Sequence, residues 1–207
     1  MRRTFVHLSV IALAACGGNP DSGSDGEMTT AETTAQATAQ PLTCGYTSAA
    51  AELAERPSPP DSVAFQVGDT HGLLCYGRPS AKGRVMVGDL DPFDTPWRMG
   101  ANEPTTLHLS GAAMVGTVSL AAGSYAVYAI PTEGDWTIVV NSSLERWGIP
   151  IGEEVRAQDV GEFTVTPTPL DPPVETLTFS YESADAANGA LVYQWEGRTF
   201  RIPVMVH

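Results

Sequence analysis

The chain has 207 residues, of which 43% are hydrophobic and 17% are charged, and its formal net charge is −13. This length fits about one domain, and the acidic balance argues against a nucleic-acid partner, because a phosphate-binding surface needs clustered cationic side chains. The 20 glycines and 16 prolines indicate many turns and favour an all-β fold.

Residues 1–15 have the composition of a targeting segment. Arg2 and Arg3 supply a positive start, and the apolar run after them is too short to span a bilayer as a stable helix. The run ends in Leu-Ala-Ala-Cys-Gly, which resembles the bacterial lipobox, a motif whose cysteine becomes the lipidated first residue of the mature protein. We therefore predict a signal peptide over residues 1–15 and membrane attachment through lipidated Cys16. The alternative is an ordinary signal peptide that happens to contain a cysteine.

The residues after Cys16 indicate where the anchored protein would lie. Inner-membrane retention signals usually carry aspartate at the position of Gly17, so the resemblance implies the periplasmic face of the outer membrane in a Gram-negative cell. Residues 17–40 contain four acidic residues but no basic or aromatic ones, and they cannot bury enough apolar surface to offset the ordering entropy. We therefore predict a lipidated cysteine and a disordered tether over residues 16–42.

Two further cysteines, Cys44 and Cys75, remain in the chain. In an oxidising envelope compartment they would form one disulfide. A closed loop of about 31 residues would contribute roughly 3.5–4 kcal/mol in the chain-entropy model. The alternative is two unpaired buried thiols.

A short N-terminal extension is predicted over residues 43–62. Thr47 would cap a helix over Ser48–Glu55, which the proline-rich run beginning at Pro57 would stop. The disulfide would then attach this extension to the main sheet.

From residue 63 onward the pattern is that of short β-strands separated by turns. Leu177, Phe179 and Tyr181 alternate with polar residues, as in a strand with one buried face. We predict a single antiparallel β-sandwich, jelly-roll-like, of roughly ten short strands over residues 63–207. The predicted strands are Val63–Val67, Gly72–Tyr76, Arg84–Val87, Thr106–Leu109, Val115–Leu120, Ser124–Ile130, Trp136–Asn141, Gly161–Thr166, Val174–Glu182, Ala190–Glu196 and Thr199–Val206, with one helical turn over Ser143–Gly148.

A cationic stretch stands out in the acidic chain. Arg78, Lys82 and Arg84 lie within seven residues, with Ser80 between them, and no acidic residue occurs nearby to pair with them. A tight turn here would present guanidinium groups and backbone N–H groups to a carboxylate or phosphate ligand. The alternative is that the arginines pair with acids elsewhere and brace loops.

A second dense cluster follows, formed by Trp97, Arg98, Asn102 and Glu103. An aromatic platform with nearby polar groups is typical of a sugar or polyol site, and Glu103 could also act as a general acid or base. The alternative is a structural loop in which Arg98 pairs with Glu103 and Asn102 makes a turn.

These two clusters carry a family resemblance, which covers roughly residues 63–206. The chain resembles the bacterial family of unknown function DUF2911, which implies an exported or lipid-anchored β-rich domain and no established activity. The matching pieces are Gly77–Arg84, Trp97–Glu103, Thr105-Thr106, Ala122–Tyr125, Ile130-Pro131, Asp135-Trp136, Asn141, Trp195 and Pro203.

No metal site or cofactor is predicted. The histidines lack the spacings of metal motifs, and the sequence contains neither a GxSxG elbow nor a glycine-rich phosphate loop. Asp89, Asp91 and Asp94 share a loop without the spacing of an EF-hand.

Three functions stay open from the sequence, together with the ligand's identity and the oligomeric state. The first is a lipid-anchored module that binds a small polar or anionic ligand at Arg78, Arg84, Arg98 and Glu103. The second is a structural or interaction lipoprotein in which these residues brace loops. The third, an envelope hydrolase using Glu103, is the least favoured. Convergence of the four residues on an open concavity would favour the first or third.

Overall fold

The computed structural model describes residues 41–46 and 48–207, which form ten strands and two short helices. The predicted signal peptide, the predicted lipidation site Cys16, the predicted tether up to residue 40 and the predicted cap Thr47 lie outside these residues. The strands are β1 (Pro60–Val67), β2 (Thr70–Gly77), β3 (Thr105–Leu109), β4 (Ala113–Val115), β5 (Val118–Leu120), β6 (Gly123–Ile130), β7 (Trp136–Asn141), β8 (Asp159–Val165), β9 (Thr168–Ser183) and β10 (Asn188–Met205), and the helices are α1 (Ala50–Ala54) and α2 (Glu153–Arg156). In the described part of the chain, no helix is long and apolar enough to cross a membrane.

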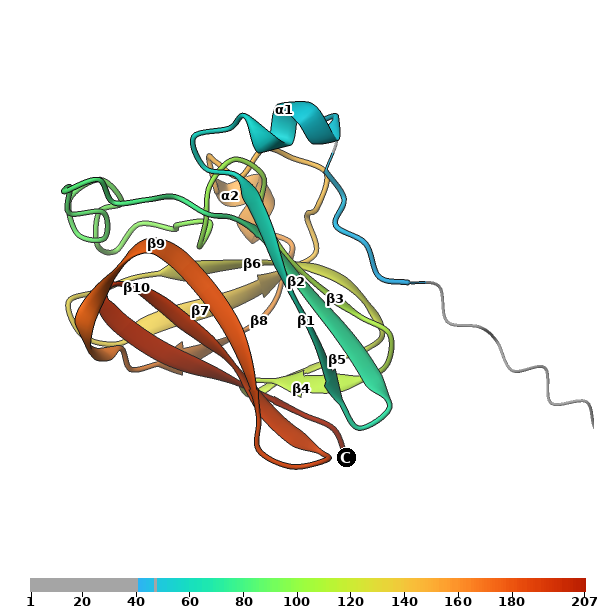
Figure 1. Cartoon of the computed structure of the whole chain (residues 1–207). Coiled ribbons are helices and arrows are strands. Elements are labelled where there is room, and N and C mark those ends of the chain that lie inside the picture. The colour runs from blue at the N-terminus through green and yellow to red at the C-terminus, as the bar shows by residue number, and fades with distance from the viewer. Residues whose placement is uncertain (1–40, 47) are drawn as a thin grey trace, which may run out of the picture. The chain divides into compact units, whose positions relative to one another are not determined.

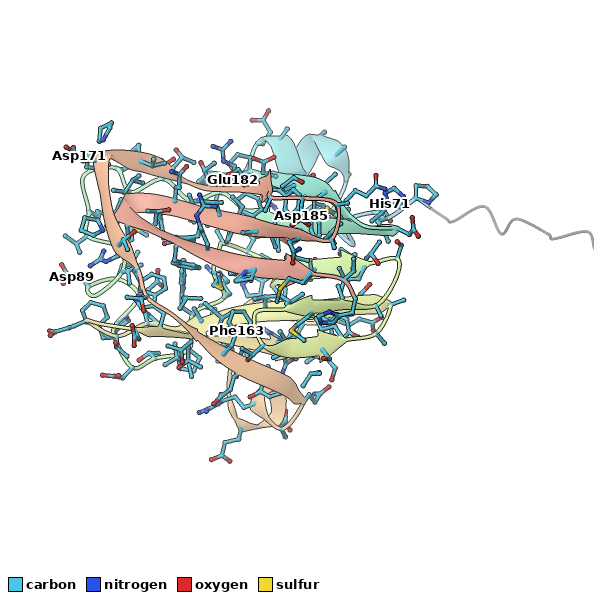
Figure 2. The ribbon with its side chains drawn as sticks, turned by 90° about the horizontal axis from the view of Figure 1, so that it is seen from below. His71, Asp89, Phe163, Asp171, Glu182 and Asp185 are labelled. Carbon is cyan, nitrogen blue, oxygen red and sulfur yellow. A yellow bond between two sulfur atoms is a disulfide. The ribbon has the colours of Figure 1, made fainter. Side chains whose placement is uncertain are left out.

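Two antiparallel sheets form the predicted sandwich. One has the strand order β1-β2-β3-β6-β7-β8, and the other has the order β5-β4-β10-β9. In Figure 1 the orange β9 crosses in front of the yellow β6 and β7. The ends of the sandwich can be found in Figure 2, with Asp89 and Asp171 at one end and His71 and Asp185 at the other.

The core follows from strict alternation along the strands. Leu107 and Leu109 of β3 face the other sheet, whereas Thr106 and His108 face away from it. Leu177 and Phe179 of β9 are buried as the alternation predicted. The strands therefore leave one outward face on the six-stranded sheet, and this face carries the site described below.

Strand β10 doubles back on itself. The Thr199 hydroxyl donates to the Tyr193 carbonyl (2.8 Å), and the rings of Tyr193 and Phe200 stack with centroids 4.4 Å apart. Residues six or seven apart in a straight strand cannot meet in this way. The backbone turns at Glu196, which has φ 52°, and at Gly197, and the two halves lie side by side next to β9 in Figure 2. The break between the predicted strands Ala190–Glu196 and Thr199–Val206 is therefore a turn.

Three predicted elements are wrong. Arg84–Val87 is not a strand, because the amides of Met86 and Val87 donate to the Glu196 carboxylate (2.9 and 3.2 Å) instead of to a neighbouring strand. Val115–Leu120 is two strands, since Gly116 (φ 60°) turns the chain against the ring of Phe163. Ser143–Gly148 contains no helical turn.

The N-terminal extension is attached to β2 by the predicted disulfide. Cys44 and Cys75 are bonded, with their Cα atoms 5.7 Å apart. The helix α1 is shorter than predicted and covers only Ala50–Ala54, with Ala49 at its N-cap and no capping side-chain bond. The disulfide and Arg56, described below, join this extension to the sandwich.

The backbone of β2 at Gly77 packs closely against the loop before β3 at Ala101. A methyl group at Gly77 would overlap the carbonyl oxygen of Ala101, which is backbone and cannot move aside. We expect Gly77→Ala to lower the free energy of unfolding by about 1–3 kcal/mol in urea unfolding. Gly134→Ala is the matched control, because its new methyl group would meet only the Thr132 hydroxyl at 3.8 Å. Equal stability of the two variants would contradict this packing.

Candidate functional site

A groove of about 590 Å³ lies on the outer face of the six-stranded sheet. Strands β3 and β6 pair directly there, although β4 and β5 separate them in the sequence. We call this feature the groove. Its lining residues are Gly45, Tyr46, Glu103, Pro104, Thr106, His108, Ser124, Leu144, Glu145, Arg146 and Trp147.

The floor of the groove is a hydrogen-bonded chain of three side chains. His108 of β3 lies opposite Ser124 of β6. Its Nδ1 is 2.7 Å from the Ser124 hydroxyl, and its Nε2 is 3.0 Å from the Thr106 hydroxyl. Burial lowers the pKa of His108 below its ordinary value. The imidazole is therefore fixed at both nitrogens and favours its neutral form.

One wall of the groove belongs to the N-terminal extension. Gly45 and Tyr46 follow Cys44 directly, so the disulfide to Cys75 holds this wall on the sheet. The Tyr46 hydroxyl donates to the Asp61 carbonyl (3.4 Å). Burial, with nearby carboxylates, raises the pKa of Tyr46 to about 12, so its phenol stays protonated at neutral pH.

The loop from Leu144 to Trp147 forms another wall of the groove. Arg146 shapes this loop, since its Nε donates to the Ser143 carbonyl (3.2 Å) and its Nη1 donates to those of Trp147 and Gly148 (3.1 and 2.9 Å). The Trp147 side chain is left 53% exposed. The indole ring of Trp147 therefore lines the groove and is not part of the buried core.

Glu103 also lines the groove. Both of its carboxylate oxygens accept from Arg56 Nη1 (2.9 and 2.7 Å), and the two side chains are only 18% and 16% exposed. The alternative in which Arg98 pairs with Glu103 is wrong, because the guanidinium partner of Glu103 is Arg56 of the extension. Since Arg56 occupies both oxygens, Glu103 is poorly placed to exchange a proton with a ligand.

Arg78 and Ser80, predicted ligand residues, hold the sheets together. Arg78 donates to the Leu177 carbonyl and the Thr178 hydroxyl, both at 3.1 Å, and lies 3.3 Å from the carboxylate of Asp61. Ser80 shares a 2.8 Å hydrogen bond with Thr176, opposite it on β9. Arg78 thus joins β1 to β9, Ser80 binds β9, and neither residue lines the groove.

Lys82 and Arg84 lie in the turn that follows. The Lys82 amide donates to the Glu175 carboxylate (2.6 Å), and Lys82 has φ 52°. The Arg84 guanidinium folds back onto the carbonyls of Ala81 and Ser80 (2.9 and 3.1 Å). The turn is tight, as predicted. The Arg84 guanidinium, however, donates its hydrogen bonds to carbonyl groups of the same turn.

The residues of the second predicted cluster are also separated. Trp97 is 4% exposed and stacks on Trp195 (centroids 5.7 Å apart), so it is a core residue. The Arg98 Nε donates to the Gly100 carbonyl (3.2 Å). The Asn102 amide donates to the Ser58 carbonyl (2.9 Å), which ties the loop to the extension.

Glu103 is thus the one predicted ligand residue that lines the groove, among the residues that the structure describes. The sequence contained a usable signal for the floor, because alternation places Thr106, His108 and Ser124 on outward faces. No local pattern predicted that β3 pairs with β6, because β4 and β5 lie between them in the sequence. No local pattern marked Tyr46 or Trp147 as walls.

Within residues 41–46 and 48–207, no three histidine, cysteine, aspartate or glutamate side chains gather as metal ligands would. Asp91 lies near Arg98 and Glu196, and burial raises its pKa. The groove itself contributes His108, Glu103 and Glu145 as charged or titratable acceptors, together with Arg146.

Comparison with known proteins gives one family. The model described as "Protein of unknown function (DUF2911)" matches residues 58–204. No curated protein and no solved structure matches the chain.

Proposed function

The chain belongs to the DUF2911 family of proteins of unknown function, and we propose that it is an envelope protein that binds a small polyhydroxylated ligand, of the sugar class, in the groove. One observation carries this proposal: two aromatic side chains, Tyr46 and Trp147, line walls above a floor of hydroxyl and imidazole groups. Sugars present apolar ring faces for stacking and hydroxyl edges for hydrogen bonds.

The charge of the groove supports an uncharged ligand over an anion. Arg56 offsets the charge of Glu103 through contacts from its Nη1 to both carboxylate oxygens. Arg146 and Glu145 add one charge of each sign, and Arg146 already donates to three carbonyl oxygens. A volume of about 590 Å³ lies within the usual range for small-molecule sites.

Attachment to the outer membrane through lipidated Cys16 completes the proposal. It is supported by the two arginines and the Leu-Ala-Ala-Cys-Gly sequence near the start of the chain. The Cys44–Cys75 bond fits an oxidising compartment. The predicted tether would then hold the sandwich at a distance from the lipid surface.

The contacts of the cationic stretch and of the second cluster support a second role, in which their residues brace the fold. Arg78 joins β1 to β9, and Asn102 joins the loop before β3 to the extension. This bracing is compatible with a ligand in the groove, because the two regions use different side chains. A hydrolase that uses Glu103 as its acid or base has no comparable support.

Trp147→Ala provides the test of sugar binding. We expect glucose, galactose or N-acetylglucosamine to raise the melting temperature of the full chain, and succinate or inorganic phosphate to raise it less. Loss of the stacking ring should weaken binding of the saccharide about tenfold, which corresponds to about 1.4 kcal/mol. Isothermal titration measures this affinity.

Leu90→Ala is the matched control, because Leu90 is 57% exposed and lies in a different loop. It should leave the affinity unchanged. A saccharide affinity that is the same in wild type, Trp147→Ala and Leu90→Ala would contradict the proposal, as would the lack of any saccharide response.

A further inference from the structure

The floor of the groove contains a serine hydroxyl bonded to an imidazole. We propose that Ser124 and His108 form a nucleophile and general-base pair that hydrolyses small esters, such as acylated sugars, bound in the groove. This inference rests on the proposed function, because the substrate would occupy the same groove. It adds a reaction and assigns it to two residues on neighbouring strands.

The hydrogen bonds supply the geometry that such a pair needs. Ser124 Oγ and His108 Nδ1 are 2.7 Å apart, within reach for proton transfer. Thr106 Oγ1 lies 3.0 Å from Nε2 and can accept a hydrogen bond from an Nε2–H group. With the proton on Nε2, Nδ1 is the acceptor and Ser124 is the donor, as a nucleophile and its base require.

Exposure and protonation suit the same roles. Ser124 is exposed at the start of β6, whereas His108, opposite it on β3, is half-buried. Burial lowers the pKa of His108, so its imidazole is free to accept a proton at neutral pH. The other titratable side chains that line the groove are Tyr46, Glu103, Glu145 and Arg146.

The reaction balances with water as the only co-reactant. Ser124 Oγ bonds to the acyl carbon while its proton passes to His108 Nδ1, and the carbonyl electron pair moves onto oxygen. Collapse of this intermediate breaks the ester bond, and the alcohol leaves with the proton from His108. Water then attacks the acyl-serine with His108 as base, which releases the acid and restores Ser124.

We assign stabilisation of the intermediate's charge to Arg146 Nη2, since Nε and Nη1 already donate to loop carbonyls. Among the described residues that line the groove, it alone carries a fixed positive charge. Its Nε and Nη1 are held by loop carbonyls, so the guanidinium is positioned before substrate arrives. A preorganised cation near a developing oxyanion stabilises the transition state.

A serine-reactive alkyl fluorophosphonate tests the pair on the full chain. Attack by Ser124 would form an O–P bond and expel fluoride, which intact mass and peptide mapping detect. We expect one adduct at Ser124, none there in Ser124→Ala, and a rate reduced about 100-fold or more in His108→Asn. Ser119→Ala on β5, whose side chain is exposed, should react at the wild-type rate.

The pH profile of the wild-type rate separates a base from a hydrogen-bonded structural residue. The rate should rise with pH and level off, with a midpoint below the ordinary imidazole pKa of about 6.5, because the neutral form is the reactive one. A purely structural His108 would give no such midpoint. This readout needs no variant and so does not depend on the folding of His108→Asn.

Two outcomes would overturn the inference: no adduct at Ser124, or an adduct whose rate is independent of His108 and of pH between about 5 and 8. Saccharide titration of wild type and Ser124→Ala separates the two proposals. Saccharide binding without labelling would overturn the reaction and leave the binding function intact. No binding and no labelling would overturn both.

Discussion

Replacing Trp97 with alanine is expected to lower the free energy of unfolding by about 3–5 kcal/mol. The indole is 4% exposed, stacks on Trp195 and meets Trp136 edge to face. Its backbone also exchanges two hydrogen bonds with Ala129 of β6 (2.7 and 2.8 Å). Removal of the ring would leave a cavity between the two sheets, which urea unfolding would register as a lower midpoint.

Trp147→Ala is the matched comparison for this experiment. Its ring is 53% exposed, so the same substitution should change stability by no more than about 0.5 kcal/mol. The two tryptophans thus have opposite expected behaviour: one affects folding and the other affects ligand binding. If Trp97→Ala changed the free energy of unfolding only slightly but abolished saccharide binding, Trp97 would be a ligand platform instead of a core residue.

Removing the disulfide is the second change with a large expected effect. Cys44 and Cys75 are 31 residues apart, and Cys44→Ser with Cys75→Ser should lower the free energy of unfolding by about 3.5–4 kcal/mol in the chain-entropy model. Because Tyr46 follows Cys44 closely, the same change would release one wall of the groove. Saccharide affinity should therefore fall along with stability.

Reduction of the wild-type protein should reproduce both effects, which controls for the serine substitutions. Stability is measured by urea unfolding, and affinity is measured by titration where the protein remains folded. A large loss of stability with unchanged saccharide affinity would show that the extension is not a wall of the binding site.

Much of the sandwich was predictable because alternation along a strand reports burial directly. Leu177 and Phe179 are buried as their pattern predicted. The prediction failed where an apolar run served another purpose. Met86 and Val87 are buried like strand residues, yet their amides bind the Glu196 carboxylate from a distant strand. A run of four residues cannot reveal a partner 110 residues away.

The candidate site was harder to predict, because its parts come from four separate segments. The runs 77–84 and 97–103, which carry the family resemblance, mainly build contacts between strands, loops and the extension. The dense polar residues of these two runs therefore stabilise contacts within the fold. Among them, only Glu103 also lines the groove. Finding His108 beside Ser124 required the β3–β6 pairing, which depends on the strand order of the whole sheet.

Amide chemical-shift mapping of the full chain during titration with N-acetylglucosamine, glucose and galactose tests the central claim most directly. If the saccharide binds in the groove, the chemical-shift changes will concentrate at residues 45–46, 106–108, 124 and 144–147, which form its floor and walls. Shifts confined to residues 78–84 and 97–99, with the groove unaffected at millimolar saccharide, would contradict it.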